Sequence, residues 1–178
     1  MSWDVWMVNA RNKVASTFGV SSDVVELETL PPDVCSGLLL FRGSVVCGVD
    51  DSPRGNSFVG VAGPDGVELN EQQVIKKVLR IWGCNGFGVV PVLKVAKTIG
   101  FLLSGIESVS AVTSDADFHY LPEDFQPHLH LPRESTNDGR PVIEWWNESG
   151  EPPFFRTQLI FEKDGSIQIT NTEIWDLV

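Results

Sequence analysis

The chain has 178 residues, 42% of them hydrophobic and 21% charged, a balance that is typical of one folded domain and excludes disorder along the whole length. The net charge of −11 disfavours nucleic acid as a partner, because a negative surface repels phosphates. The three cysteines form no C-x-x-C pair and, being odd in number, exclude a closed disulfide framework.

The N-terminal part is predicted to contain mainly short strands. WDVWMV alternates in the manner of a strand over residues 3–8, and a short helix over 10–18 is expected after it. A strand around 24–27 stops at Pro31 and Pro32, since proline lacks the amide hydrogen that strand pairing needs. GLLLFRGSVVCGV then suggests two short strands with a turn at Gly43 and Ser44.

Two amphipathic helices follow a strand that runs into a turn at residues 64–66. Asn70 is suited to cap the first helix, whose apolar residues recur at helical spacing: Val74, Ile75, Val78, Leu79 and Trp82. Pro91 is expected to begin the second helix. Its apolar stripe consists of Val92, Val95, Ala96, Ile99, Leu102 and Leu103. Short strands are predicted at 87–90 and in SVSAVTS.

The C-terminal part is predicted to begin with a long acidic loop over residues 114–141, because prolines at 122, 127, 132 and 141 interrupt regular structure. VIEWWNES follows as a strand, and FFRTQLIFEKDGSIQITN as a hairpin that turns at 163–166. We therefore predict an α+β fold, in which a mainly antiparallel sheet packs with two principal helices in a single domain over 1–178.

No segment is predicted to enter a membrane. The longest nearly uncharged run, FGVVPVLKVAKTIGFLLSGI, contains Pro91, Lys94 and Lys97 and falls short of a span. The start, MSWDVWMVNARNK, lacks the basic and apolar regions of a secretory signal, so we expect a cytoplasmic protein.

No cofactor is predicted either. DDSPRGNS and FVGVAGPDGVEL lack the lysine and hydroxyl residue that follow the last glycine of a P-loop. GCNGFG leaves a helix, whereas a dinucleotide fingerprint joins a strand to one.

A metal site is the first hypothesis for function. DADFHYLPEDFQPHLH holds all three histidines, and in an extended chain His128 and His130 would share a face, as would Asp117 and His119. A metal-dependent hydrolase would use Asp117, His119, His128 and His130, from which a two-histidine, one-carboxylate site could be formed. The alternative is a surface loop whose histidines bond to its own backbone, since no known ligand spacing is matched.

Paired carboxylates are the second hypothesis. Glu123 with Asp124, or Glu144 with Glu148, would suit acid–base catalysis if burial kept one partner protonated. Because the chain has 24 acidic residues, such pairs arise by chance and are poorly specific.

An acidic protein-binding surface is the third hypothesis. Residues 109–178 hold four Lys and Arg against thirteen Asp and Glu, so most of the negative charge lies there. Adjacent Trp145 and Trp146 must point to opposite faces of a strand, and one of them can be an exposed anchor. The expected contact residues are Asp117, Glu123, Asp124, Glu144 and Glu148 against a basic protein, with Trp146 or Phe125 as the apolar anchor. A core tryptophan beside a solvated acidic edge would explain the same residues.

A resemblance favours the third hypothesis. MSWDVWMV and SFVGVAGPDGVELNEQQVIKKVLRIWGCNGF resemble segments of short bacterial proteins of the toxin-immunity type, which share a helix exit matched by Arg80, Ile81, Asn85, Gly86 and Phe87. The resemblance ends after Phe87 and brings no functional residue with it. It implies an inhibitor that occludes the active cleft of a toxin, and it favours this function over that of an enzyme. A nuclease target and a structural or accessory subunit remain alternatives, and the oligomeric state is not predicted.

Overall fold

The computed structural model describes residues 2–45, 56–83, 88–103, 110–114, 118, 121–148 and 154–177. The chain forms two compact units, the first from residues 1–81 and 102–106 and the second from 82–101 and 107–178. Each unit contains one antiparallel sheet. The predicted α+β class is confirmed, with two sheets where one was expected. None of the helices in these ranges is long and apolar enough to cross a membrane.

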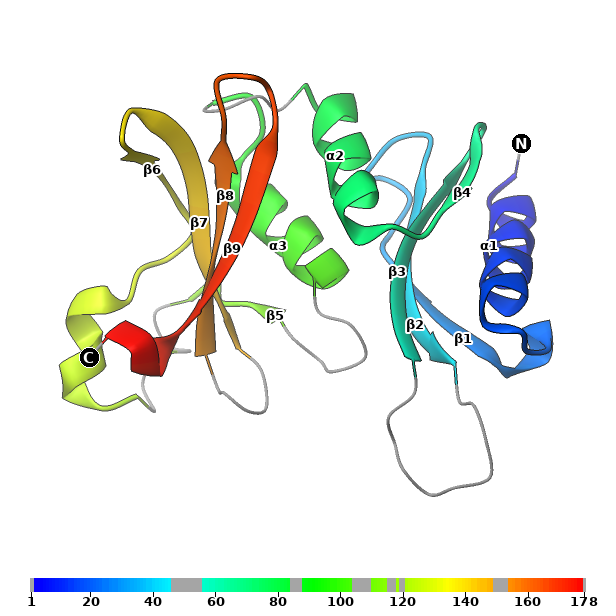
Figure 1. Ribbon diagram of the computed structural model, residues 1–178, viewed down its shortest axis with the longest axis horizontal. Helices are drawn as coiled ribbons and strands as arrows, with labels where there is room; N and C mark the ends of the chain where they lie inside the picture. The colour runs from blue at the N-terminus through cyan, green and yellow to red at the C-terminus, as the bar shows by residue number, and fades with distance from the viewer. Residues whose placement is uncertain are drawn as a thin grey trace. The chain divides into compact units, whose positions relative to one another are not determined.

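The first unit is a sheet with a helix on each face (Figure 1). Its strands lie in the order β1-β2-β3-β4, and every neighbouring pair is antiparallel. Helix α1 packs against one face and α2 against the other, so the core has two layers of apolar side chains. The elements are α1 (Trp3–Phe18), η1 (Ser22–Val24), β1 (Val25–Thr29), β2 (Leu39–Val45), β3 (Asn56–Gly63), β4 (Gly66–Glu68) and α2 (Glu71–Ile81).

Helix α1 replaces the strand predicted over residues 3–8, and that prediction is wrong. Six alternating positions cover less than two helical turns. Such a short pattern does not distinguish the two-residue period of a strand from the 3.6-residue period of a helix. The longer stripe is helical, and the side chains that pack on the sheet are Trp3, Trp6, Met7, Ala10, Val14 and Phe18. Val5, which alternation would bury together with Trp3 and Met7, is 42% exposed. Gly19 ends the helix in the left-handed conformation.

Gly43 and Ser44 lie inside β2, so the turn predicted there is wrong, and residues 46–49 of the predicted second strand lie outside the described residues. A Cβ built on Gly43 would collide with the carbonyl oxygen of Glu26 on β1 and the ring of Phe58 on β3. The glycine therefore serves close packing between strands instead of a reversal of the chain.

The predicted start of α2 is confirmed. The side-chain Oδ1 of Asn70 accepts the backbone N–H of Gln73 at 3.1 Å and caps the helix. The predicted turn between β3 and β4 is also present, and Gly66 supplies its positive φ of 107°.

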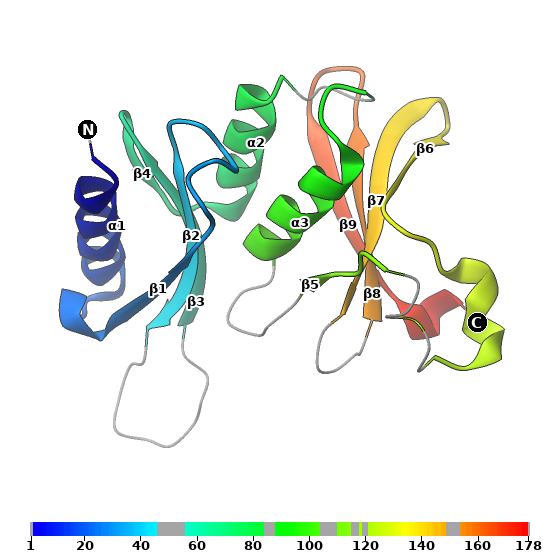
Figure 2. The same cartoon turned by 180° about the vertical axis from the view of Figure 1, so that it is seen from behind.

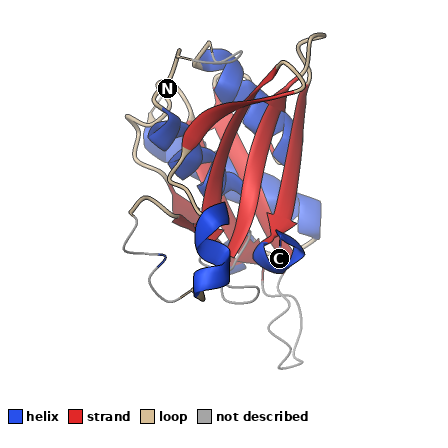
Figure 3. Cartoon of the chain, turned by 90° about the vertical axis from the view of Figure 1, so that its left-hand side faces the viewer, coloured by secondary structure: helices blue, strands red, loops and turns tan. Residues whose placement is uncertain are grey.

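The second unit is built on a sheet in the order β5-β7-β8-β9, with β6 also paired to β7. Helix α3 covers one face, as Figure 2 shows, and a Cβ built on its Gly100 would lie 3.1 Å from Asn147 Oδ1 of β7. Two 3₁₀ helices lie at one end of the sheet (Figure 3). The elements are α3 (Val92–Leu103), β5 (Ser110–Ala111), η3 (Glu123–His128), β6 (Arg133–Asn137), β7 (Arg140–Glu148), β8 (Phe154–Phe161), β9 (Ile167–Glu173) and η4 (Ile174–Leu177).

The segment 114–141 holds more regular structure than the predicted loop, because it contains η3, β6 and the start of β7. Asp138 and Gly139 have φ of 52° and 75° and form the two-residue turn of a β6–β7 hairpin. Pro141 is tolerated because it pairs with Thr136 at a position where the strand amides face away from β6. Residues 88–90 form a bend instead of the predicted strand, and Phe87 lies outside the described residues.

Candidate protein-binding surface

The two 3₁₀ helices are fixed to the second unit by apolar side chains. Phe125 of η3 and Ile174 of η4 are 5% and 0% exposed, and they lie in a cluster with Val112, Phe118, Trp146 and Phe154. This cluster packs on the Trp146 face of β7, opposite the face that α3 covers, because side chains alternate along a strand.

Trp175 points outward from the same end of the sheet. It follows the buried Ile174 directly, yet 51% of its surface is exposed. Its ring meets that of Phe125 edge to face at 5.0 Å, so a buried residue of η3 supports an exposed residue of η4. An aromatic side chain that is held in place and half exposed is typical of an interface anchor.

The chain segments at this end of the second unit are acidic and lack lysine and arginine. The sequence has no Lys or Arg over 107–132, 145–155 and 170–178, which include η3, η4 and the ends of β7, β8 and β9 that adjoin them. Strand pairing brings Glu148 of β7 and Glu173 of β9 to the same end, since both oppose the first residues of β8. Five exposed carboxylates there have no ion-pair partner among the described residues: Glu123, Asp124, Glu148, Glu173 and Asp176. We call Trp175 and these five residues the acidic end.

Only some of the contact residues predicted from the sequence lie in the acidic end, and others are buried. Glu123, Asp124 and Glu148 belong to the acidic end. Phe125 and Trp146 do not project as anchors, because they are 5% and 0% exposed in the apolar cluster. Trp145 is also fully buried, so both faces of β7 are covered and neither tryptophan is available. Asp117 lies outside the described residues.

Glu144 was expected to face a partner, but it is 3% exposed and bonded within the sheet. Its Oε1 accepts Arg133 Nε–H at 2.8 Å, and its Oε2 accepts Gln158 Nε2–H at 2.8 Å. Burial opposes the charge of Glu144, but the hydrogen bonds from Arg133 and Gln158 outweigh burial and hold its pKa below the ordinary value. Glu144 is therefore ionised at neutral pH, which does not suit the protonated acid of a catalytic carboxylate pair.

His130 lies beside Glu144 on the same face of the sheet. Its Nε2 is 3.9 Å from Glu144 Oε1, and its Nδ1 donates to the carbonyl oxygen of Leu131 at 3.0 Å. Burial lowers the pKa of His130, against the effect of that backbone hydrogen bond, so the imidazole is neutral at neutral pH.

The metal hypothesis gains no support from the residues that can be placed. His128 is exposed on η3, whereas His130 is largely buried, so the two do not present a common face. Asp117 and His119 lie outside the described residues. In the part of the chain that is described, no three His, Cys, Asp or Glu side chains converge on one point.

Trp175 is the residue that sequence patterns missed. The signal available was the order Ile-Trp-Asp, in which two large apolar residues are adjacent to a carboxylate. Comparison of the chain with protein-family models, with curated proteins and with solved structures gives no match.

Proposed function

We propose that this chain is a cytoplasmic protein-binding inhibitor, and most simply an immunity protein whose acidic end occludes the active cleft of a bacterial toxin. The observation that carries the proposal is the half-exposed Trp175 among five carboxylates that have no ion-pair partner among the described residues. Unpaired carboxylates attract a basic surface at long range, and a fixed aromatic ring contributes most of the affinity once contact is made.

The proposed contact residues differ from those predicted from the sequence in the apolar anchor and in two of the carboxylates. Trp175 takes the place of Trp146 and Phe125 as the anchor, and Glu173 and Asp176 replace Glu144. Occlusion is steric and electrostatic, so the inhibitor needs no bound metal or cofactor for this function.

The test is binding to the toxic product of the adjacent gene, measured by co-purification and then by association and dissociation rates. Trp175→Ala should weaken binding about thirtyfold or more, mainly through faster dissociation. The pair Glu123→Gln and Asp124→Asn should slow association and make it less sensitive to salt.

A matched control changes the net charge equally in the other unit. Asp4→Asn with Asp33→Asn alters two exposed carboxylates of the first unit and should leave the association rate unchanged. The proposal fails if the neighbouring product does not bind, or if the variants of the acidic end bind it as the wild type and the control pair do.

A further inference from the structure

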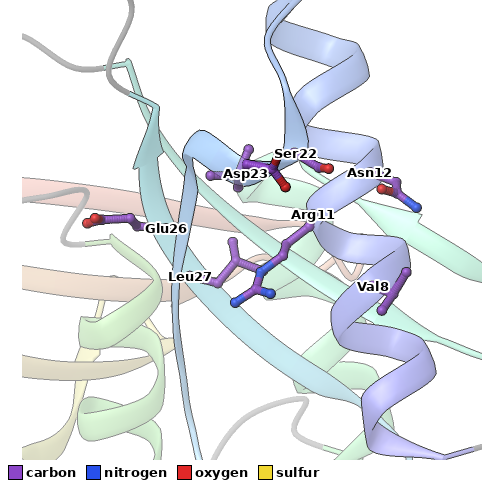
Figure 4. A pocket seen from close by; sticks show the side chains of 8 residues that line it. Val8, Arg11, Asn12, Ser22, Asp23, Glu26 and Leu27 are labelled. Carbon is purple, nitrogen blue, oxygen red and sulfur yellow. The ribbon is translucent and has the colours of Figure 1, made fainter.

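A groove with a volume of about 710 Å³ lies between α1 and β1 in the first unit (Figure 4). Val8, Arg11 and Asn12 stand three and four positions apart and so line it from one side of α1. The other lining residues are Ser22, Asp23, Val25, Glu26 and Leu27. Because β1 is the outermost strand in the order β1-β2-β3-β4, the groove follows a sheet edge.

The backbone of β1 offers hydrogen-bonding groups to this groove. Leu30 N–H donates to Leu40 O at 3.1 Å, so in the same register Glu28 and Glu26 also direct their peptide groups toward β2. The carbonyl oxygen of Glu26 does point at Gly43 of β2. The intervening residues Leu27 and Thr29 must therefore direct both N–H and C=O outward, where they have no strand partner among the described residues.

The groove closes at its other end, and its lining holds one cation, Arg11, and two carboxylates, Asp23 and Glu26, neither of which forms an ion pair with Arg11. The outward N–H of Val25 is already bonded to Ser22 O at the end of η1, so pairing begins at Leu27. Figure 4 shows the guanidinium of Arg11 extended from α1 toward Leu27. The guanidinium of Arg11 has no hydrogen bond or ion pair with any other described residue. Beside it Val8 is 55% exposed, which leaves apolar surface for a ligand to cover.

We propose that an extended segment of another protein binds in this groove as an added strand on β1 and places an internal Asp or Glu side chain against Arg11. The outward groups of Leu27 and Thr29 supply main-chain hydrogen bonds, and the guanidinium supplies the preference for a carboxylate. The carboxylate is that of a side chain because Arg11 lies beside the middle of β1, so the bound chain continues past it. This site is independent of the acidic end, which lies in the other unit and favours positive charge.

The first experiment selects peptides from a displayed random library on the immobilised full chain. Enriched peptides should share an acidic residue within an uncharged, β-prone stretch. A synthetic peptide of the enriched sequence should slow amide hydrogen exchange at Leu27 and Thr29, which are otherwise unprotected by β2. Arg11→Gln should weaken its affinity about tenfold or more, because a charge-assisted hydrogen bond is lost.

Two further variants distinguish binding in the groove from unfolding and from a general effect of charge. Thr29→Pro removes an outward N–H that β2 does not use, so it should weaken the peptide while urea unfolding shows an intact fold. Lys13→Gln removes an exposed charge from α1 outside the groove and should leave affinity unchanged.

Three results would overturn the proposal. One is enrichment of the same peptides on Thr29→Pro, and another is selection of peptides without Asp or Glu. The third is protection of the Leu27 amide that rises with protein concentration when no peptide is present, since the occupant would then be a second copy of this chain.

Discussion

The rings of Phe125 and Trp175 meet edge to face, with centroids 5.0 Å apart and planes at 81°, and this contact joins η3 to η4. Phe125 is buried in the core of the second unit, whereas half of Trp175 is exposed. The pair therefore fixes the direction of a side chain of which about half remains in solvent.

We predict that Trp175→Ala lowers the free energy of unfolding by less than Trp146→Ala, because half of Trp175 is exposed; the aromatic pair accounts for about 0.5–1.5 kcal/mol of the loss, in addition to the apolar surface that is buried. Trp146→Ala, which leaves a cavity in the core, should cost about 3–5 kcal/mol. Urea unfolding of both variants measures the difference. Equal losses would mean that Trp175 is a core residue and would remove it as an anchor.

The Arg133–Glu144 ion pair is asymmetric, since Arg133 is 54% exposed in its side chain and Glu144 only 4%. Glu144→Gln leaves buried donors without a charged acceptor and should cost about 1–3 kcal/mol. Arg133→Gln should cost less, about 0.5–1 kcal/mol, because Gln158 still bonds to Glu144 and water screens this position. A double-mutant cycle measures the coupling, and costs in the reverse order would contradict the asymmetry.

Stability should fall in acid because of His130. Burial holds its folded pKa below the ordinary value of about 6.5, with Arg133 and Arg156 acting in the same direction and Glu144 against them. Below pH 6.5 the unfolded chain binds a proton that the folded chain resists, so the free energy of unfolding decreases as the pH falls toward the lower folded pKa. His130→Gln should flatten this part of the pH profile.

His128→Gln is the control for that profile, since His128 is exposed on η3. Its slope should match that of the wild type. At lower pH both variants should still lose stability, because the contribution of Glu144 is present above its ordinary pKa and disappears as the pH falls through its lowered folded value. An unchanged slope in His130→Gln would contradict the assignment.

A buried chain of hydrogen bonds crosses the sheet on the side that α3 covers. Trp145 Nε1–H donates to Asn147 Oδ1 at 2.9 Å, and Asn147 Nδ2–H donates to Thr157 Oγ1 at 2.7 Å. Asn147→Leu should cost about 1–3 kcal/mol for each group left unpaired. Asn12→Leu, at an exposed position of α1, should change stability by less than about 0.5 kcal/mol. Similar losses for the two variants would show that the chain of bonds does not stabilise the fold.

Gly43→Ala tests the close packing of β1, β2 and β3. Alanine usually improves a strand, but here its Cβ meets the Glu26 carbonyl and the Phe58 ring, so we expect a loss of about 1–3 kcal/mol. Ser44→Ala at the next position should stay within about 0.5 kcal/mol. A stabilising Gly43→Ala would mean that the strands can separate without cost.

The sequence alone determined the features that depend on neighbouring residues. Asn70 caps α2 because capping needs one side chain and the amide three residues later. The β8–β9 hairpin and the amphipathic α3 follow from local periodicity and turn residues in the same way. The concentration of negative charge in residues 109–178 is likewise a property of composition.

Only the tertiary structure decided which side chains are exposed and which strands face solvent. Trp146 and Trp175 are both tryptophans near carboxylates in the sequence, but the packing of η3 and η4 buries the first and leaves the second outside. Glu144 looks like a surface charge until β6 and β8 bring Arg133 and Gln158 to it. These outcomes depend on contacts between residues distant in the chain, and local propensity carries no information about such contacts.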